Sequence, residues 1–189
     1  MYHVPVVSVA RQLTQQNSEA EASMQHSDRA LAGSQRFATT SLRLIATSDL
    51  HASLLPYDYC ANRPNTNLGL GAISQQIAEA RGEAQNCLLF DNGDFLQGNP
   101  LADYAANSRR RRAHPVITAF NTLGYDAVTL GNHEFDYGLR FLSQALADAQ
   151  FPVVSANVAT RLGKSPARDE TLVPPFTILR RLVAEQVQM

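Results

Sequence analysis

The sequence predicts an α/β fold, because short apolar segments that suit buried strands alternate along the chain with segments of helical periodicity. The predicted strands cover residues 42–47, 87–90, 126–130 and 152–155. The predicted helices cover residues 69–83, 101–106, 114–123 and 137–149. A second observation favours a parallel sheet: carboxylate, amide or imidazole side chains directly follow each of the first three strands. Right-handed crossovers would place these strand ends at one edge of the sheet, where open sheets form their site crevice.

The first strand, residues 42–47, is rich in Leu and Ile and runs into polar residues. Residues 54–68 contain Tyr, Pro and Asn, which argue against regular structure there. In the helix over residues 69–83, two isoleucines lie four positions apart on one face, with Gln and Glu on the other. Residues 87–90, Cys-Leu-Leu-Phe, are short and apolar enough for a second buried strand.

Proline marks the start of the next two helices. The short helix over residues 101–106 begins behind Pro100. The helix over residues 114–123 has Pro115 in its first turn, and its Val, Ile and Phe side chains are expected to face inward.

Residues 126–130, Asp-Ala-Val-Thr-Leu, form the third predicted strand because they are few, apolar and branched. The helix over residues 137–149 carries an inward-facing leucine stripe that begins at Leu139. Residues 152–155 are the fourth strand, and residues 176–179 are a candidate for one more.

Composition places the folded part in a single domain, since the chain has 189 residues and 44% hydrophobic content. The formal net charge of -1 gives no general reason to expect nucleic-acid or membrane binding. No apolar stretch approaches the roughly 18 residues of a membrane span. Cys60 and Cys87 do not form a CxxC motif; Cys87 is interpreted as a small core residue and Cys60 as a free thiol in a loop.

Residues 1–41 are predicted to be a disordered or weakly helical arm, and residues 42–189 to be the folded domain. From residue 11 to residue 40 the chain is rich in Gln, Ser, Glu and Ala, and too few large apolar side chains are present to offset the entropy of ordering. The arm lacks the basic start and the apolar segment of about 7–15 residues that a secretory signal requires, so export is not supported.

The most informative stretch, residues 131–136, reads Gly-Asn-His-Glu-Phe-Asp and directly follows the third strand. Asn132 offers a neutral oxygen that can ligate a cation, and His133 can carry a proton near neutral pH. Asp136, three positions on, is placed to hold that imidazole in one tautomer. The plain alternative is a polar loop that caps the next helix.

The other two strand ends carry carboxylates as well. Asp49 and His51 lie two positions apart, so in extended backbone both side chains would project to one side and share a cation. Residues 91–93 read Asp-Asn-Gly and are compatible with an ordinary turn. Asp94 after them suits a carboxylate that bridges two cations.

A mixed set of Asp, Asn and His ligands favours Mn, Zn, Fe or Co over calcium or a structural zinc. A carboxylate between two cations is the layout for metal-assisted attack of water on an ester.

Two further features are interpreted as structural. The four arginines at residues 109–112 lie between two helices and are typical of a solvated surface loop, although they would also attract phosphate esters to a nearby site. His114 is interpreted as structural or exposed rather than as a metal ligand.

The motifs Asp49-x-His51, Gly93-Asp94 and residues 131–134 resemble, in order, the first three motifs of the calcineurin-like metallophosphoesterases. Within that superfamily, residues 91–104 and 131–138 resemble the bacterial 2',3'-cyclic-nucleotide 2'-phosphodiesterase/3'-nucleotidase branch of the 5'-nucleotidase family. The similarity corresponds to the N-terminal part of the family's catalytic domain. It implies a layered metallophosphoesterase-type α/β sandwich, present here in part.

The resemblance implies two divalent metal ions, Mn, Zn, Fe or Co. Asp49 and His51 would ligate the first ion, Asp94 would bridge both, and Asn132 would ligate the second. His133, steadied by its carboxylate neighbour Asp136, would be the catalytic histidine.

The implied substrate is a small-molecule nucleotide. A 2',3'-cyclic nucleotide would be opened to the 3'-nucleotide, which would then be hydrolysed to nucleoside and phosphate. The resemblance also implies a periplasmic location.

The sequence departs from the family in its histidines. Family members supply further metal-binding histidines from two later motifs, and a second domain that stacks the base. The last histidine of this chain is His133. We therefore expect a partial site in a shortened chain that binds metal weakly and turns over slowly or not at all.

Three other functions are compatible with the sequence. They are a noncatalytic metal-binding or nucleotide-binding remnant, a 5'-nucleotidase-type activity, and a nuclease of the same superfamily. Only the arginine run supports the nuclease, and the net charge of -1 speaks against it.

Overall fold

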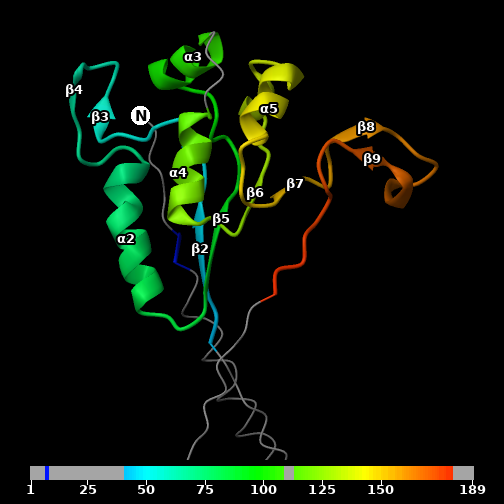
Figure 1. Cartoon of the computed structure of the whole chain (residues 1–189), viewed down its shortest axis with the longest axis horizontal. Coiled ribbons are helices and arrows are strands. Elements are labelled where there is room, and N and C mark those ends of the chain that lie inside the picture. Colours follow the sequence, from blue (N-terminus) through cyan, green and yellow to red (C-terminus); the bar gives the residue numbers. More distant parts are fainter. Residues whose placement is uncertain (1–6, 9–40, 109–112, 181–189) are drawn as a thin grey trace, which may run out of the picture.

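The computed structural model describes residues 7–8, 41–108 and 113–180. Its centre is a five-stranded sheet with the order β1-β2-β5-β6-β7 (Figure 1). The strands are β1 (Val7–Ser8), β2 (Arg43–Thr47), β5 (Cys87–Asp91), β6 (Ala127–Thr129) and β7 (Val153–Val154). Strands β2, β5, β6 and β7 run parallel, and β1 pairs antiparallel with β2. The predicted parallel α/β fold is confirmed.

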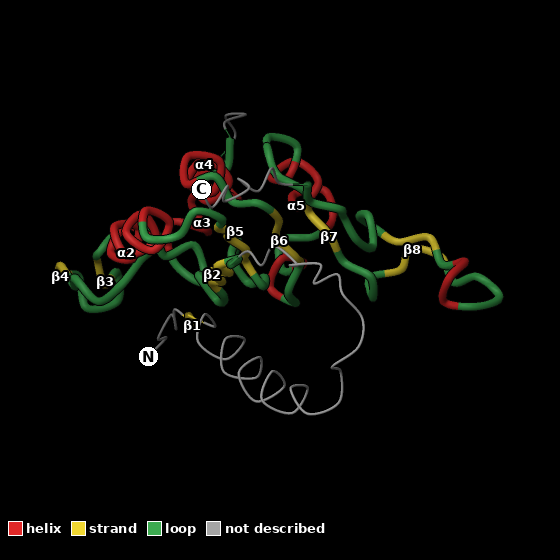
Figure 2. Tube along the Cα trace, turned by 90° about the horizontal axis from the view of Figure 1, so that it is seen from below, coloured by secondary structure: helices red, strands yellow, loops and turns green. Residues whose placement is uncertain are grey.

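The described helices are α2 (Leu70–Gly82), α3 (Pro100–Asn107), α4 (Pro115–Leu123) and α5 (Leu139–Leu146). Figure 2 shows α2, α4 and α5 on the same side of the sheet. Their buried side chains form one core with the inward residues of the strands, such as Ile77 and Phe120 with Leu89. The other face is more open in the described part of the chain, where Leu44 of β2 is 43% exposed.

The strand register aligns the carboxyl ends that the site needs. Thr47 pairs with Asp91, and Asp91 pairs with Val128 of β6. Because the strands are parallel and in this register, the loops after β2, β5 and β6 leave the sheet at one edge. The sequence-based expectation that the polar groups gather at one edge is confirmed for these three loops.

Polar side chains begin two of the helices. The Asn99 side chain accepts hydrogen bonds from the N–H groups of Leu101 and Ala102 at the start of α3. His114 is the N-cap of α4, where its Nδ1 accepts from the N–H of Val116 at 3.3 Å. His114 is only 5% exposed. The interpretation of His114 as a structural residue is therefore confirmed, and the alternative that it is exposed is wrong.

The expectation of an irregular loop at residues 54–68 is wrong in part. Strands β3 (Tyr57–Asp58) and β4 (Arg63–Pro64) form a small antiparallel hairpin there. The Asp58 carboxylate accepts from the N–H groups of Cys60 and Ala61 at 3.0 and 2.9 Å, which turns the chain between the strands. Cys60 is an exposed free thiol, as expected.

The helix predicted over residues 137–149 is shorter, Leu139–Leu146. A 3-10 turn, η1 (His133–Phe135), and Gly138 with φ 82° precede it, so the chain enters the helix later than the leucine pattern suggests. Leu139 is 58% exposed and does not belong to the inward-facing stripe.

The candidate strand at residues 176–179 is not formed. Pro174 and Pro175 precede it and lack the N–H groups that a sheet ladder needs, and Phe176 and Ile178 are exposed. The chain instead forms a separate hairpin, β8 (Ala159–Arg161) with β9 (Glu170–Thr171), around the 3-10 turn η2 (Pro166–Arg168).

Most of the predicted arm at residues 1–41 lies outside the described residues, as do the arginines at 109–112; within the arm, Val7–Ser8 form β1. Among the helices that the structure describes, none has the length and apolar character to cross a bilayer.

Candidate metal centre

The loops after β2 and β5 continue to pair beyond the ends of the strands. The N–H of Asp49 donates to Gly93 O at 3.1 Å, and the N–H of His51 donates to Asp94 O at 2.8 Å. Asp49, His51 and Asp94 have φ of 55°, 49° and 60°, in the left-handed region that residues with a Cβ seldom adopt. Such conformations persist where the surroundings enforce them, and they are concentrated at functional sites.

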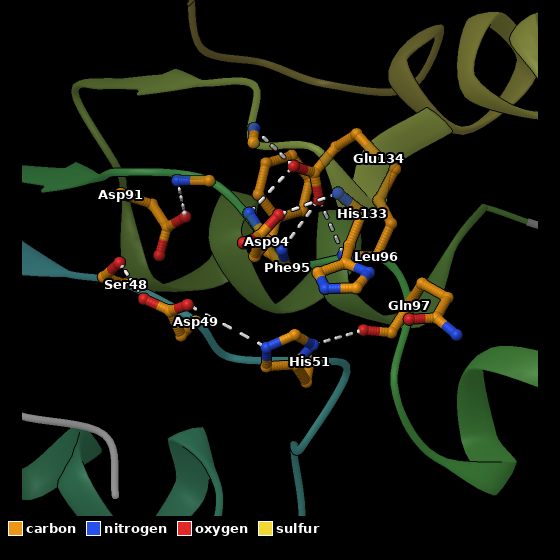
Figure 3. Close-up of polar contacts among 12 residues, drawn as sticks. Ser48, Asp49, His51, Asp91, Asp94, Phe95, Leu96, Gln97, His133 and Glu134 are labelled. Atoms are coloured by element: carbon orange, nitrogen blue, oxygen red, sulfur yellow. Dashed lines mark hydrogen bonds and ion pairs between the residues drawn. The ribbon is translucent and has the colours of Figure 1, made fainter. Parts of the chain in front are cut away.

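The predicted extended backbone between Asp49 and His51 is therefore wrong. The two side chains still approach each other, with His51 Nε2 3.9 Å from Asp49 Oδ1 (Figure 3). Their approach results from the left-handed backbone of both residues, and not from the alternation of side chains along a strand.

His51 is held by the loop after β5. Its Nδ1 lies 2.8 Å from the backbone oxygen of Gln97. Because a carbonyl oxygen can only accept, this contact places the ring hydrogen on Nδ1 and leaves Nε2 as a lone-pair donor for a cation. Gly98, with φ 138°, packs so closely that a Cβ there would lie 2.6 Å from the Cβ of His51. The ring thus has a fixed tautomer and a fixed place.

Asp94 joins the loops after β5 and β6. Its Oδ1 accepts from the backbone N–H of His133 at 2.9 Å. The potential metal-ligand atoms of His51, Asp94 and His133 all lie within 4.8 Å of one another, which is close enough for one cation to contact all three. The structure thus brings together predicted residues from three different loops.

His133 and Asp136 form the expected pair. His133 Nδ1 lies 2.8 Å from Asp136 Oδ2, and the hydrogen bond raises the pKa of the imidazole above its usual value, with smaller contributions from the charges of Asp94, Asp136 and Glu134. The ring lies edge-on to the ring of His51, with centroids 5.1 Å apart. The second nitrogen of His133, Nε2, is left free of the Asp136 contact.

Asn132 precedes His133 at the start of the same turn. Its side chain is exposed, and its backbone oxygen accepts the N–H of Phe135 at 3.2 Å. Asn132 therefore lies on the loop that also supplies His133, directly before it in the sequence.

Two buried carboxyl groups were not recognised as important in the sequence. Glu134 is 0% exposed and accepts four backbone N–H groups (Figure 3). Its place inside the Gly-Asn-His-Glu motif was the only signal, because its partners come from distant parts of the chain.

Asp91 is the second buried carboxyl group, and it is 2% exposed. It accepts from Thr47 Oγ1 at 2.5 Å and from the N–H of Gly93 at 2.9 Å, so the turn interpretation of residues 91–93 fits. Thr47 Oγ1 also lies 2.8 Å from the Tyr125 hydroxyl. Burial raises the pKa of Asp91 to about 7, against the opposing effect of its hydrogen bonds.

No protein-family model matches the chain. Over 151 residues it is 45% identical to a 2',3'-cyclic-nucleotide 2'-phosphodiesterase/3'-nucleotidase of Salmonella typhimurium, an alignment that covers 79% of this chain and 23% of that enzyme. It is 44% identical over 130 residues to the trifunctional nucleotide phosphoesterase protein YfkN of Bacillus subtilis, covering 66% of this chain and 9% of YfkN. It is 32% identical over 143 residues to the 5'-nucleotidase of Rattus norvegicus, covering 73% of this chain and 24% of that protein.

The fold of the chain is also similar to that of one of these relatives. The crystal structure of calcineurin-like phosphoesterase YfkN from Bacillus subtilis superposes with a TM-score of 0.70 at 39% identity, and the match covers 77% of this chain and 43% of that one. The chain thus spans less than a quarter of the length of the curated relatives described above.

Proposed function

Because this chain belongs to the calcineurin-like metallophosphoesterases, as its likeness to YfkN in sequence and fold shows, we propose that it is a metal-dependent phosphoester hydrolase of nucleotides. One observation carries the proposal. Three loops that are distant in sequence bring the donor atoms of His51, Asp94 and His133 within 4.8 Å of one another at the carboxyl edge of the sheet.

The residues present fit divalent cations. His51 offers a nitrogen with a lone pair, since its other nitrogen is bonded to the Gln97 carbonyl. Asp49 and Asp94 add carboxylate oxygens, and Asn132 adds a neutral oxygen. This mixed set suits Mn, Zn, Fe or Co. In the proposed arrangement, Asp49 and His51 hold one cation, Asp94 is shared, and Asn132 holds the second.

When bound, the cations would neutralise charge on the phosphoryl oxygens and activate water. The chain's own contribution is to fix the positions of the ligands. Asp94 is held by the His133 N–H, and His51 by the Gln97 carbonyl. Such support lets the site bind the transition state without rearranging.

His133 has two possible roles, a fifth metal ligand or an acid that protonates the leaving sugar oxygen. The pair with Asp136 supports the second role. A carboxylate at Nδ1 raises the pKa of the ring and therefore favours its protonated form, which an acid needs and a ligand lacks. We assign His133 as the catalytic histidine and Asp136 as the residue that orients it.

The substrate class follows from the relatives. Identity is 45% to the Salmonella 2',3'-cyclic-nucleotide 2'-phosphodiesterase/3'-nucleotidase and 32% to the rat 5'-nucleotidase. The difference favours a 2',3'-cyclic nucleotide, opened to the 3'-nucleotide, over a 5'-nucleotide. A 5'-nucleotidase-type activity and noncatalytic metal or nucleotide binding are the alternative functions.

The test is a Mn²⁺ titration of the purified 189-residue chain, followed by assays of phosphate release and of cyclic-ester opening. The substrates are 2',3'-cyclic AMP, 3'-AMP and 5'-AMP. We expect Mn²⁺ to bind and to be required for any turnover of the cyclic ester. Absence of Mn²⁺ binding would contradict the proposal.

Two variants separate the roles within the site. Asp94→Asn should abolish Mn²⁺ binding at this site, because it removes the shared carboxylate. His133→Gln should retain Mn²⁺ binding and lose turnover. Loss of Mn²⁺ binding in a folded His133→Gln variant would identify His133 as a ligand instead.

A further inference from the structure

Glu134 carries a completely buried carboxylate, and its hydrogen-bond partners in the described part of the chain are all backbone amides. Its Oε2 accepts from the N–H groups of Asp94 at 2.8 Å and Gly131 at 2.6 Å. Its Oε1 accepts from Phe95 at 2.7 Å and Leu96 at 3.1 Å. Among the described residues, none of the ion pairs involves Glu134. The hydrogen bonds from the four amides therefore replace the hydrogen bonds to water that the Glu134 carboxylate loses on burial.

These amides belong to two different loops. Asp94, Phe95 and Leu96 follow β5, whereas Gly131 follows β6 and lies in the same turn as Glu134. The glycines allow the loops to touch: a Cβ on Gly93 would lie 2.9 Å from the Cα of Gly131. One side chain thus fixes the separation and the register of the two loops that carry the proposed metal ligands.

The hydrogen bonds around Asp94 are reciprocal. The backbone N–H of Asp94 donates to the Glu134 carboxylate. The Asp94 carboxylate accepts from the backbone N–H of His133, the residue directly before Glu134. Asp94 also has φ of 60°, a conformation that needs support from its surroundings. Neighbours on one turn therefore hold both the backbone and the side chain of Asp94.

The geometry points to Glu134 as a positioning residue that clamps the loops after β5 and β6 so that Asp94 faces the proposed cation position with His133 beside it. The clamp itself is a property of the fold. Its effect on metal affinity rests on the proposed function.

The carboxylate is required by the chemistry of its partners. All four are donors, and a carboxylate presents acceptor positions on both oxygens. In Glu134→Gln, the NH₂ group would face two backbone N–H donors and leave them unpaired. Loss of such support for metal ligands reduces metal affinity by about 10–100-fold.

The first measurement tests the clamp without metal. In the wild-type chain labelled with ¹⁵N and ¹³C, scalar couplings through hydrogen bonds should connect the Glu134 carboxyl carbon to the amide nitrogens of residues 94, 95, 96 and 131. Couplings from these amides to other acceptors would overturn the clamp. This result does not depend on the folding of any variant, or on metal binding.

The second measurement compares Mn²⁺ affinity, by electron paramagnetic resonance, in three folded variants. Glu134→Gln should lose at least about tenfold in affinity. Glu79→Gln makes the same chemical change on the exposed face of α2 and should bind Mn²⁺ as the wild type does. Ile77→Ala removes a core side chain of α2, so it destabilises the fold but should keep the affinity.

The outcomes are distinguishable. Equal Mn²⁺ affinity in the wild type and a folded Glu134→Gln variant would overturn the positioning role. A wild type that shows the four couplings but binds no Mn²⁺ would retain the clamp and contradict the proposed function instead.

Discussion

Gly131 packs directly against Asp94, so closely that a Cβ on Gly131 would lie 2.7 Å from both the Cγ and the backbone nitrogen of Asp94. This contact brings the loop after β6 onto the carboxylate that we propose to be shared between two cations. A glycine at position 131 is therefore required by space, because any Cβ would displace that carboxylate.

Gly131→Ala should lower the free energy of unfolding by about 1–3 kcal/mol, the usual effect of overpacking. It should also lower Mn²⁺ affinity, because the displaced side chain is Asp94. The control is Gly82→Ala at the end of α2, where a Cβ would meet nothing within 4 Å. Urea unfolding and a Mn²⁺ titration check both variants, and unchanged affinity in Gly131→Ala would contradict the packing argument.

Asp136→Asn should lower the pKa of His133. The hydrogen bond from Asp136 is the largest cause of the raised pKa, and an amide gives weaker support to the imidazolium than a carboxylate does. An NMR titration of the imidazole nitrogens measures the change directly. An unchanged pKa would mean that the contact between Nδ1 and Asp136 is not formed in solution.

Asp91→Asn should change how stability depends on pH. Burial raises the pKa of Asp91 from 3.8 to about 7 in the folded state, so the folded state holds this proton more tightly than the unfolded chain does. Stability linked to Asp91 is therefore highest below pH 3.8 and is lost as the pH rises toward 7. The asparagine does not titrate. The stability of the variant relative to the wild type should therefore be greater at pH 8 than at pH 5.

The size of this effect is about 3 kcal/mol, since only the two units between pH 5 and the folded-state pKa of about 7 contribute and each unit corresponds to about 1.4 kcal/mol. Urea unfolding at pH 5 and pH 8, in the presence of a metal chelator, measures this difference. Asp148→Asn, on the exposed surface, is the matched control and should show no such difference. The same stability difference between Asp91→Asn and wild type at both pH values would contradict the assignment.

For His114 we predict the opposite dependence of stability on pH. Burial lowers the pKa of its imidazole from 6.5 to about 4, and Nε2 has no hydrogen-bond partner among the described residues. The unfolded chain then takes up the proton first, so stability is lost as the pH falls from about 6.5 to about 4, by up to about 3 kcal/mol. His114→Asn keeps an N-cap acceptor and should lose less stability over that range, as urea unfolding would show. An equal loss in the variant would contradict this account.

Much of the fold is predictable because its signals are local. The apolar runs that became β2 and β5, and the helical spacing of Ile73 and Ile77 in α2, depend only on neighbouring residues. The position of the site was predictable for the same reason, since polar residues follow each strand. The helix start at Leu139 was not, because η1 and the positive φ of Gly138 delay it.

The site geometry depended on long-range contacts that no local pattern reveals. Asp49 and His51 adopt left-handed conformations because the loop after β5 pairs with them. Glu134 bonds amides about 40 positions away in the sequence, at residues 94–96. The hairpin of β8 and β9 consists largely of exposed residues, so hydrophobic periodicity gave no signal for it.

The most direct test of the central claim is an anomalous diffraction map at the manganese edge from crystals of this chain grown with Mn²⁺. We expect a peak bonded to the Asp94 carboxylate, with His51 or Asn132 among its other ligands. Manganese bound elsewhere while Asp94 has no metal neighbour would contradict the assignment of this edge of the sheet as a metal centre.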